Sequence, residues 1–587
     1  MADVTEKAVL TFTLHDPVYV HVDISASDPK EVRKLQTYIF ASMTYFDQNK
    51  AKSWECREGF KSPMVYFFNK EENLLPIGLV PRMCKLVQNR FQNVTFKLDK
   101  AVRDLFVPPK GELTMDDVKA YAATLNIHNL HSGTPLVPYE HQIKLATRAI
   151  NGRRISLLAC TSAGKSLSMM IIARYLVERE RKKVLIVVPS TNLVEQLFSD
   201  FHDDYGWEDA RSYCTLIYAT SDDKLSKKQK ERLAENNLGE EVMLKSITIS
   251  TWQSLQNKPD KFFECFTAVM VDEAHSTRGE KLRDILSKCI NATDFKIGLS
   301  GTLPDIGIDA GYIESQLGRK EEIVRLKELV AKGILTPVTV NSLWVPYPRQ
   351  LRTKICGMNY DEESSLCMNN SSRRDVMKLL IDSGKITTEQ NTVILFRLIT
   401  NLELMEQFLR ANYPQFKYYV IKGDISTDER EKIRKSIEYS TANIILATYG
   451  CMKQGVNIKL LHNLVMSDPA KSQYMVVQSV GRIVRPHKDK PMAYVYDIVD
   501  DASYFTNPRN GGPPKLRANY GVRHYEDRKQ YYDKDDIPIN DIHMDGIYEA
   551  QVDMDLIAEK RKKAAEKAAE KVKKNKNANV FKKKFFM

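Results

Sequence analysis

The stretch that decides the fold is Ile155-Ser156-Leu157-Leu158-Ala159-Cys160-Thr161-Ser162-Ala163-Gly164-Lys165-Ser166. Its first four residues predict a short buried strand, and the run Leu167–Leu176 after it has apolar residues at helical spacing. A strand, a turn of small residues ending in Gly-Lys-Ser and a helix are typical of a phosphate-binding loop, because backbone N–H groups and a helix N-terminus attract anions. Lys165 can then reach the β- and γ-phosphates, and the Ser166 hydroxyl can ligate Mg²⁺.

The match to the strict phosphate-loop pattern is imperfect, because that pattern has a glycine where Ala159 stands. The alternative is a turn of small residues that joins a strand to a helix in an unrelated α/β domain. Other motifs farther along the chain must decide between these two interpretations.

The second chemical motif is Asp272-Glu273-Ala274-His275, which follows the apolar run Ala268–Val271. At the end of a strand, Asp272 can hold Mg²⁺ through its water shell, and Glu273 can accept a proton from the water that attacks the γ-phosphate. Two adjacent carboxylates at a strand end are common by chance. Downstream of a phosphate-binding loop in an αβ pattern, the same pair favours nucleoside triphosphate chemistry.

Two weaker motifs are judged by their position along the chain. Gln142 lies just before a predicted helix, where its amide can meet both a donor and an acceptor on adenine, although a single Gln is usually a surface residue. The strand Lys296–Leu299 ends in Ser300-Gly301-Thr302, whose two hydroxyls can relay hydrogen bonds toward a bound polymer. The bland interpretation of this second motif is a plain Ser/Gly turn.

Length and composition bound the class of protein. A chain of 587 residues with 43% hydrophobic and 28% charged residues is typical of a globular protein of several domains. It has no run of 18 apolar residues and no apolar core of a signal peptide, so no membrane segment is expected. The nine cysteines form no CxxC pair, which favours a reducing cytoplasm over a zinc site or a disulfide framework.

The net charge of +12 is unevenly distributed. Residues 558–587 hold 12 Lys and Arg against 3 Glu, a net of +9, so the remaining chain carries only +3. Residues 564–571 repeat Ala-Ala-Glu-Lys, which has strong helix formers and no large apolar residue, so residues 550–587 are expected to be a solvated extension. This Lys-rich tail is a candidate DNA arm, a solubilising tail, or, through Phe585-Phe586, a docking tip for a replication partner.

Composition and patterning divide the first half of the chain. Residues 1–105 predict a small α+β domain with two strands around the turn His15–Pro17, and residues 106–135 predict a linker around a short helix. The range 136–315 predicts the first α/β domain. Within it, residues 203–245 are polar and charged, and they predict a surface excursion with a helix through Lys224–Leu233.

A second αβ series occupies residues 316–500. The runs Thr392–Phe396, Tyr418–Ile421 and Ile444–Thr448 predict strands that alternate with helices, which implies a mainly parallel sheet without its own phosphate-binding loop. Residues 501–587 are predicted to be a C-terminal extension that ends in the Lys-rich tail.

This second series ends in a conspicuous basic helix. Gln478, Arg482 and Arg485 are spaced i, i+4, i+7, so they are expected to share one helical face. Such a face can meet a triphosphate held by a neighbouring domain and stabilise transition-state charge. A solvated basic face is the alternative, but the apolar Ile483 and Val484 on the opposite side favour a docked helix.

In this order, the motifs resemble those of superfamily 2 helicases and translocases. Over residues 10 to 500 the chain is similar to the UvsW-type helicases of T-even-like bacteriophages. The phrases that carry this resemblance are Leu-Leu-Pro-Ile-Gly-Leu-Val at 74–80, Thr-Ser-Ala-Gly-Lys-Ser at 161–166, Ser-Thr-Trp-Gln at 250–253 and Gln-Ser-Val-Gly-Arg-Ile-Val-Arg at 478–485.

The resemblance implies an α/β fold of two RecA-like parallel-sheet domains with ATP between them, a small N-terminal nucleic-acid-binding domain and a basic C-terminal tail. The implied catalytic residues are Lys165, Asp272, Glu273, Gln478, Arg482 and Arg485. The implied ATP-binding residues are Gln142, Thr161, Ser162, Ala163, Gly164, Lys165, Ser166 and Gly455, with Mg²⁺ on Ser166 and Asp272. The implied nucleic-acid contacts are Thr191, Thr251, Gly423, Arg430 and Thr448. His141 stands where many relatives have a tyrosine, and the Lys-rich tail is not part of the family core.

The function that the resemblance implies is ATP-driven work on branched DNA: branch migration of Holliday junctions, fork remodelling and removal of R-loops. Its expected partners are DNA, RNA–DNA hybrids and phage recombination or replication proteins, and it is expected to be a monomer in the cytoplasm of the infected bacterium. Two alternatives stay open. One is a double-strand DNA translocase subunit that does not separate strands, and the other is a nucleic-acid-binding scaffold, which the presence of Lys165, Asp272, Glu273 and Arg485 disfavours.

Overall fold

The computed structural model describes residues 8–218, 244–369, 372–423, 427–453, 458–468, 472–506 and 514–544. The chain divides into two compact units, one built mainly from Met1–Leu335 and the other mainly from Thr336 onward. Within the described ranges, no helix is both long and apolar enough to cross a bilayer. The predictions for Lys224–Leu233, Gly455 and the Lys-rich tail lie outside the described residues.

The first unit begins with the predicted α+β domain. Its strands are β1 (Ala8–Leu14), β2 (Tyr19–Ser25), β5 (Leu74–Pro76) and β6 (Val94–Leu98), in the sheet order β5-β2-β1-β6. The turn between β1 and β2 closes on Asp16, whose carboxylate accepts hydrogen bonds from two backbone N–H groups at 2.7 Å. Helices α1 (Pro29–Ser42) and α4 (Val80–Arg90) cover the sheet, as the sequence predicted.

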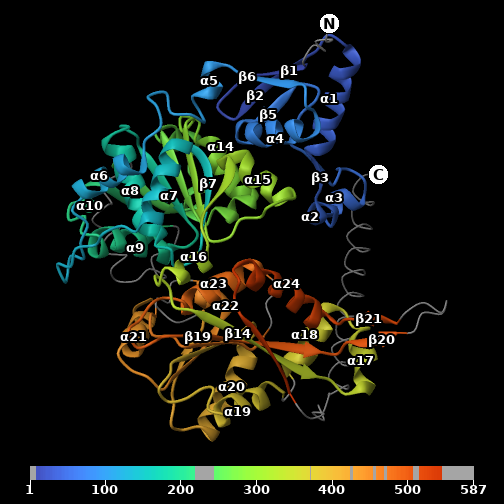
Figure 1. The fold of residues 1–587 in the computed structure, drawn as a ribbon, viewed down its shortest axis with the longest axis vertical. Coiled ribbons are helices and arrows are strands. Elements are labelled where there is room, and N and C mark those ends of the chain that lie inside the picture. The colour runs from blue at the N-terminus through green and yellow to red at the C-terminus, as the bar shows by residue number, and fades with distance from the viewer. Residues whose placement is uncertain are drawn as a thin grey trace, which may run out of the picture. The chain divides into compact units, whose positions relative to one another are not determined.

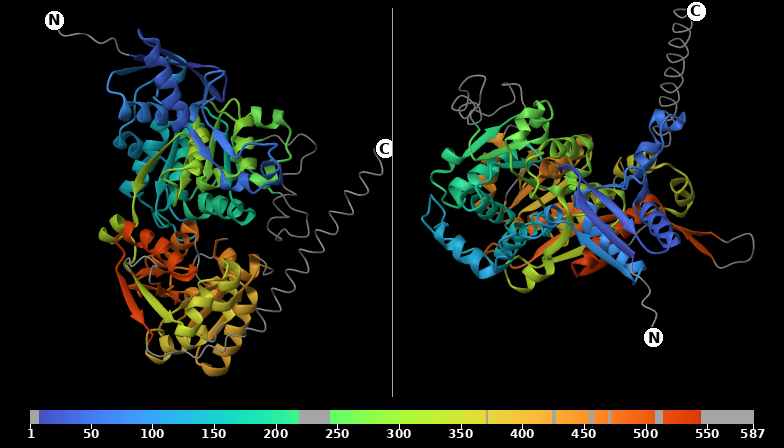
Figure 2. Two further views of the ribbon diagram at one scale, coloured as in Figure 1. Left: turned by 90° about the vertical axis from the view of Figure 1, so that its right-hand side faces the viewer. Right: turned by 90° about the horizontal axis from the view of Figure 1, so that it is seen from above.

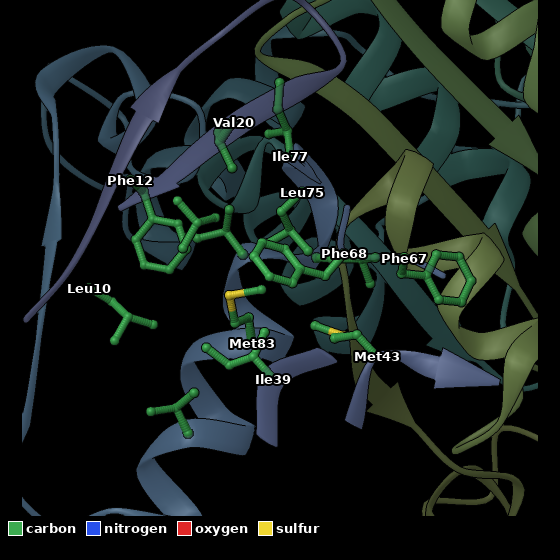
Figure 3. Packing of buried hydrophobic residues seen from close by; sticks show 14 of the residues in the cluster. Leu10, Phe12, Val20, Ile39, Met43, Phe67, Phe68, Leu75, Ile77 and Met83 are labelled. Carbon is green, nitrogen blue, oxygen red and sulfur yellow. The ribbon is translucent and has the colours of Figure 1, made fainter. Parts of the chain in front are cut away.

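Helix α1 shows how the sequence sets this domain. Asp28 caps the helix by accepting from the Lys30 N–H at 2.9 Å, and Pro29 fits the first helical position. Leu35 and Ile39 lie one turn apart and are fully buried in the core of this domain, in which Figure 3 labels Ile39. Burying each such side chain contributes about 2 kcal/mol of hydrophobic free energy.

The α+β domain packs firmly against α15 (Ile308–Leu317) of the same unit. Arg82 makes a two-pronged ion pair with Glu314, with N···O distances of 2.6 and 2.8 Å. The Phe67 ring lies so close to Gly311 that a Cβ there would come within 2.5 Å of it. The Arg82 guanidinium is therefore engaged in the contact between the α+β domain and α15. The nucleic-acid-binding role of this domain stays a prediction.

A seven-stranded parallel sheet forms the centre of the first unit. Its order is β13-β7-β12-β11-β8-β10-β9. The strands are β7 (Arg154–Ala159), β8 (Val184–Val188), β9 (Cys214–Ile217), β10 (Ile247–Thr251), β11 (Ala268–Asp272), β12 (Phe295–Ser300) and β13 (Arg319–Val324).

Connections in the two directions across a parallel sheet place helices on opposite faces. Helices α7 (Glu140–Gly152) and α8 (Lys165–Glu178) accordingly lie on one face, and α14 (Glu280–Lys288) and α15 on the other (Figure 1).

Two parts of the first unit differ from the sequence-based expectation. The short helix predicted within the linker 106–135 is α6 (Met115–Thr124), but this segment is more than a connection, because α6 packs against α7 and its Val118 and Ala122 are buried. The predicted surface excursion at 203–245 begins with buried residues, including Trp207, and supplies the edge strand β9. In both places a few apolar side chains at the right spacing are buried despite a polar local composition.

The second unit is built on another seven-stranded parallel sheet, of order β16-β17-β15-β18-β19-β14-β22. The strands are β14 (Val338–Pro346), β15 (Thr392–Phe396), β16 (Lys417–Ile421), β17 (Asn443–Thr448), β18 (Asn463–Met466), β19 (Ala493–Asp501) and β22 (Ile539–His543). The three predicted strands are confirmed as β15, β16 and β17. The two parallel sheets confirm the predicted α/β fold with two RecA-like domains.

Sheet pairing crosses two of the predicted domain limits. β13 pairs with β7, so the first sheet continues past residue 315. β22 pairs with β14, so the second sheet includes residues after 500, where an extension had been expected. β20 (Tyr504–Thr506) and β21 (Lys515–Arg517) form a two-stranded ribbon that projects from this unit (Figures 1 and 2).

Helix α24 (Tyr520–Lys534) is tied to the second sheet by a buried ion pair. Arg528 and Asp497 of β19 are both fully buried, and they form two hydrogen bonds of 2.9 Å. The Tyr532 hydroxyl donates a third hydrogen bond to the same carboxylate at 3.0 Å. These contacts explain why residues after 500 belong to the packed unit.

We expect Arg528→Ala to destabilise the second unit by about 3–5 kcal/mol, because it leaves the buried Asp497 charge without its guanidinium partner. Thermal unfolding of the full chain should show a large drop in the midpoint. Arg517→Ala, at an exposed position in β21, is the matched control and should leave the midpoint nearly unchanged. Equal midpoints for the two variants would show that the buried pair does not hold α24.

Candidate functional site

Five predicted motifs of the first unit follow the carboxyl ends of neighbouring parallel strands. The phosphate-binding loop follows β7, Asp272 ends β11, Ser300 ends β12, Thr251 ends β10, and Thr191 lies just beyond β8. In the pairing register Ser300 lies opposite Leu158, and Asp272 lies opposite Leu299. The loop, the carboxylates and Ser300 therefore meet at one edge of the sheet, which is the usual ligand-binding edge of such folds.

The loop after β7 has the backbone that a phosphate cradle needs. Ser162 and Gly164 adopt left-handed conformations, with φ of 69° and 74°, and α8 begins directly afterwards at Lys165. The Lys165 ammonium curls back into the loop, where it lies 3.3 Å from the Ala159 carbonyl and 3.4 Å from the Cys160 carbonyl. The loop thus presents the N-terminus of a 14-residue helix and one cation at the same place.

Gln142 lies against this loop with its amide engaged by the protein. Its Oε1 accepts from the Tyr139 N–H at 2.8 Å, and its Nε2 donates toward the carbonyls of Ala163 and Gly164 at 3.3 and 3.4 Å. In this conformation Gln142 links the start of α7 to the loop, and the reading of adenine by its amide stays a prediction.

His141, which stands where many relatives have a tyrosine, is buried against the same loop. Its ring lies parallel to that of Tyr139, with centroids 5.6 Å apart, and its Nε2 lies 2.9 Å from the Ala163 carbonyl oxygen. Tyr139, and not residue 141, presents the half-exposed aromatic ring beside the loop.

The carboxylate pair after β11 sits in a hydrogen-bonded network. Glu273 has a left-handed backbone, with φ of 51°, and its Oε2 lies 3.2 Å from the Ser300 hydroxyl and 3.3 Å from Nδ1 of His275. Ser300 also accepts from the Thr302 N–H at 3.2 Å. The predicted Ser-Gly-Thr turn therefore contacts the Asp-Glu pair directly.

The pKa values of the two adjacent carboxyls shift in opposite directions. Burial and the neighbouring Glu273 raise the pKa of Asp272 to about 7. Burial also acts to raise the pKa of Glu273, but the hydrogen bond with His275 and the charge of Lys165 outweigh it and lower that pKa. Glu273 is therefore ionised near neutral pH, which a residue that accepts a proton from water requires.

The side chains at this edge fit a magnesium ion. The Ser166 hydroxyl at the start of α8 and the Asp272 carboxylate at the end of β11 are hard oxygen donors, which Mg²⁺ prefers. The single positive charge of Lys165 acts on both buried carboxyl groups, Asp272 and Glu273. A divalent cation at this place would offset the second negative charge.

The predicted nucleic-acid contacts of the first unit differ in accessibility. Thr191 is the first residue of α9 (Thr191–Ser199) and is partly exposed. Thr251 is only 1% exposed, and its hydroxyl caps α12 (Trp252–Leu255) by accepting from the Ser254 N–H at 3.2 Å. The structure therefore leaves Thr191 available at the surface and engages Thr251 in holding a helix.

The predicted basic helix of the second unit is α23 (Gln473–Ile483). Gln478 and Arg482 lie in it and are mostly buried, but the helix ends before Arg485. The prediction that all three share one helical face is therefore wrong for Arg485. Pro486 explains the difference, because a proline disfavours helical backbone at the residue before it.

Two residues that sequence reasoning missed hold the end of α23. Thr336 donates its N–H to the Val484 carbonyl at 2.8 Å and its hydroxyl to the Arg485 carbonyl at 3.2 Å. Lys490 is 2% exposed and donates to the carbonyls of Ile483 and Lys459 at 2.8 and 2.7 Å. The backbone of Arg485 is therefore positioned although it lies outside the helix.

Two further predicted residues, Thr448 and Gly423, lie at or just after the ends of strands in the second sheet. Thr448 ends β17, and its hydroxyl lies 3.1 Å from the Cys451 sulfur. Gly423 follows β16 and is exposed. Arg430 lies in α21 (Thr427–Glu438), with its side chain outside the described residues.

Tyr205 is a further residue at the first site, and no sequence pattern indicates it. It follows α9 through a π-helical turn at Asp200–Asp204, and its hydroxyl lies 2.6 Å from the Ser166 hydroxyl. It is an isolated tyrosine in a polar stretch, and nothing in the spacing of its neighbours connects it to the phosphate-binding loop.

Two family models and a bacteriophage helicase match this chain. The family model "Type III restriction enzyme, res subunit" matches residues 135–305, and "Helicase conserved C-terminal domain" matches residues 372–487. The chain is 28% identical over 519 residues to the ATP-dependent DNA helicase uvsW of Enterobacteria phage T4, covering 88% of this chain and 96% of that protein.

Solved structures resemble the chain as well. The crystal structure of T4 UvsW is similar over 91% of this chain and 99% of its own, at 25% identity and a TM-score of 0.44. The Type ISP restriction-modification enzyme LlaBIII, solved bound to DNA, covers 71% of this chain and 33% of its own, at 16% identity and a TM-score of 0.47.

We expect Glu273→Gln to keep nucleotide binding and to lower ATP turnover by at least about 100-fold, because an amide cannot accept the proton of the attacking water. Lys165→Ala should instead weaken nucleotide binding, because the phosphates lose their positioned cation. A fluorescent nucleotide titration and a steady-state ATPase assay separate the two effects. Near-normal turnover of Glu273→Gln would remove Glu273 from the role of base.

The stability of the second unit should depend on the protonation of Lys490. Burial and the nearby Arg485 lower the pKa of Lys490 from 10.5 to about 7. Between these two values the unfolded chain binds a proton that the folded chain does not, so Lys490 makes stability rise with pH by up to about 1.4 kcal/mol per unit. Lys490→Met lacks this dependence.

Urea unfolding of the wild-type protein and of Lys490→Met at pH 7 and pH 9 checks this expectation. The difference in unfolding free energy should shift in favour of the wild-type protein at the higher pH. A constant difference across this range would mean that the Lys490 ammonium keeps an ordinary pKa in the folded protein.

Proposed function

We propose that this chain is a nucleic-acid-dependent ATPase and DNA helicase of the UvsW type, and that it remodels branched DNA. The proposed reactions are Holliday-junction branch migration, fork remodelling and R-loop unwinding in phage recombination, repair and replication. The proposal rests above all on the extent of the similarity to the T4 helicase, which spans 88% of this chain and 96% of that one. That similarity also extends beyond the two family models, which match residues 135–305 and 372–487.

The residues at the edge of the first sheet have distinct proposed roles in hydrolysis. Gly164 and the start of α8 hold the phosphates of ATP, and Lys165 neutralises their charge. Bound at Ser166 and Asp272, Mg²⁺ would add positive charge at the transferred phosphoryl group. Glu273, kept ionised and held by Ser300 and His275, accepts the proton of the attacking water.

We also propose that one amide and two guanidinium groups of the second unit contribute to the same reaction. Gln478 and Arg482 of α23, together with Arg485 just beyond it, act on the phosphoryl group as charge develops. A guanidinium acts mainly in the transition state of such reactions. The fixed backbone around Arg485 supports this role, because a positioned cation loses less entropy when it engages the phosphate. Gln142, Thr161, Ser162, Ala163 and Gly455 complete the proposed nucleotide contacts.

We assign nucleic-acid binding to the N-terminal α+β domain and to strand ends of both sheets. The proposed contacts are Thr191, Thr251, Gly423, Arg430 and Thr448, with Thr251 acting through its backbone since its side chain is buried. The protein acts as a monomer in the cytoplasm of the infected bacterium, beside phage recombination and replication proteins. The relative that supports this setting is itself a bacteriophage helicase.

A duplex translocase that does not separate strands is the second candidate function. The observation that favours it is the match of residues 135–305 to a restriction-enzyme family model. Such a protein would hydrolyse ATP on linear duplex as fast as on branched DNA, and it would release no strand.

We expect the ATPase rate with Holliday junctions and forks to exceed the rate with linear duplex and single strands, and we expect strand exchange only in the presence of ATP. Parallel assays of hydrolysis and of labelled-strand release on these four DNAs, with Glu273→Gln as the inactive control, measure both. Equal stimulation by linear duplex without strand release would favour the translocase. Binding of all four DNAs without any hydrolysis would favour a scaffold.

A further inference from the structure

Tyr205 makes a contact that its place in the chain does not explain. Its hydroxyl oxygen lies 2.6 Å from the hydroxyl oxygen of Ser166, which stands 39 positions earlier in the chain. Ser166 is the second residue of α8, immediately after the lysine of the phosphate-binding loop. A tyrosine from a distant segment therefore touches one of the two side chains that fit a magnesium ion.

The segment that carries Tyr205 is held rigidly on both sides. The Tyr205 N–H donates to the Asp200 carbonyl at 2.9 Å within the π-helical turn. The Leu130 N–H donates to the Asp203 carbonyl at 2.8 Å, and Gly206 lies so close to His128 that a Cβ there would come within 2.6 Å of the His128 ring. The position of the phenol is thus fixed by the fold. Single π-helical turns of this kind are frequent at functional sites.

The hydrogen-bonding capacity of a serine hydroxyl suggests what the contact with Tyr205 does. Such a group has one proton and two lone pairs. When a lone pair of Ser166 faces a cation, the proton must point to an acceptor elsewhere. The phenol oxygen of Tyr205 is an acceptor at a short hydrogen-bonding distance, so a proton directed to it leaves the lone pairs of Ser166 free.

We propose that Tyr205 is a positioning residue that orients the Ser166 hydroxyl for Mg²⁺. It does not touch the phosphates or the metal in this assignment. It acts through Ser166, in the way that outer partners of metal ligands fix the orientation of those ligands. The inference rests on the proposed function, since it requires that Ser166 ligates the metal of bound ATP.

Tyr205 also links this hydroxyl to a predicted nucleic-acid contact. Thr191 is the first residue of α9, α9 continues into the π-helical turn, and Tyr205 follows that turn. One continuous segment therefore runs from Thr191 to Tyr205, and the Tyr205 hydroxyl at its end contacts the Ser166 hydroxyl.

The test measures the Mg²⁺ dependence of nucleotide binding, without turnover. A fluorescent ATP analogue is titrated against the full chain with EDTA and then across a range of Mg²⁺ concentrations. Tyr205→Phe should need about 10-fold more Mg²⁺ for half of the metal-dependent gain in affinity, in line with the loss of other outer partners of metal ligands. Binding in EDTA and the thermal midpoint should match the wild-type protein.

The matched control is Tyr121→Phe. Tyr121 is a buried tyrosine of the same unit whose hydroxyl donates to Glu178 at 2.9 Å, away from Ser166. This variant should keep the wild-type Mg²⁺ dependence. If Tyr205→Phe also kept it, or needed less Mg²⁺, the positioning role would be overturned.

A double variant distinguishes a failure of the positioning role of Tyr205 from a failure of the proposed Mg²⁺ site at Ser166. Ser166→Ala should lose most of the Mg²⁺-dependent gain, and Tyr205→Phe in that background should cause no further loss, because the two residues act on one hydroxyl. Additive losses would overturn the inference. A Ser166→Ala variant with the wild-type Mg²⁺ dependence would contradict the proposed metal site itself.

Discussion

The constraint on which the first unit depends is the parallel direction of its strands. Because every strand of that sheet runs the same way, the carboxyl ends of β7, β11 and β12 meet at one edge. This brings a helix N-terminus and Lys165 next to two carboxylates, Asp272 and Glu273, which would otherwise repel each other in a buried place. The charges at this edge are complementary to a triphosphate with a divalent cation, so the electrostatics of the fold and the proposed chemistry agree.

In the second unit, buried polar contacts attach helices to the sheet. The ion pair of Arg528 with Asp497 ties α24 to β19, and a second buried pair joins Arg373 to Asp500 at the end of the same strand. Lys490 fixes the end of α23. The two ion pairs join residues 31 and 127 positions apart, and the pair of Arg528 with Asp497 ties residues beyond the predicted limit at 500 into the unit.

The sequence predicted those features that depend on neighbouring residues. The phosphate-binding loop, the strand before Asp272 and the strands β15, β16 and β17 of the second sheet follow from local patterns of apolar and small residues. Features set by distant contacts could not be predicted in this way. Tyr205 reaches Ser166 only because the fold returns there, and the late strand β22 pairs with β14 across almost 200 residues. For Arg485 the local signal was present in Pro486, but the helical spacing of the three residues concealed it.

The central claim is that one edge of the first sheet binds the phosphates of ATP with a divalent cation. A crystal structure of the full chain with ADP, aluminium fluoride and Mn²⁺ tests it most directly, because anomalous scattering locates the metal. The account predicts the fluoride group beside Lys165, with the metal on the hydroxyl of Ser166 and near Asp272. Metal or phosphate density at any other place in the chain, with this edge empty, would contradict the account.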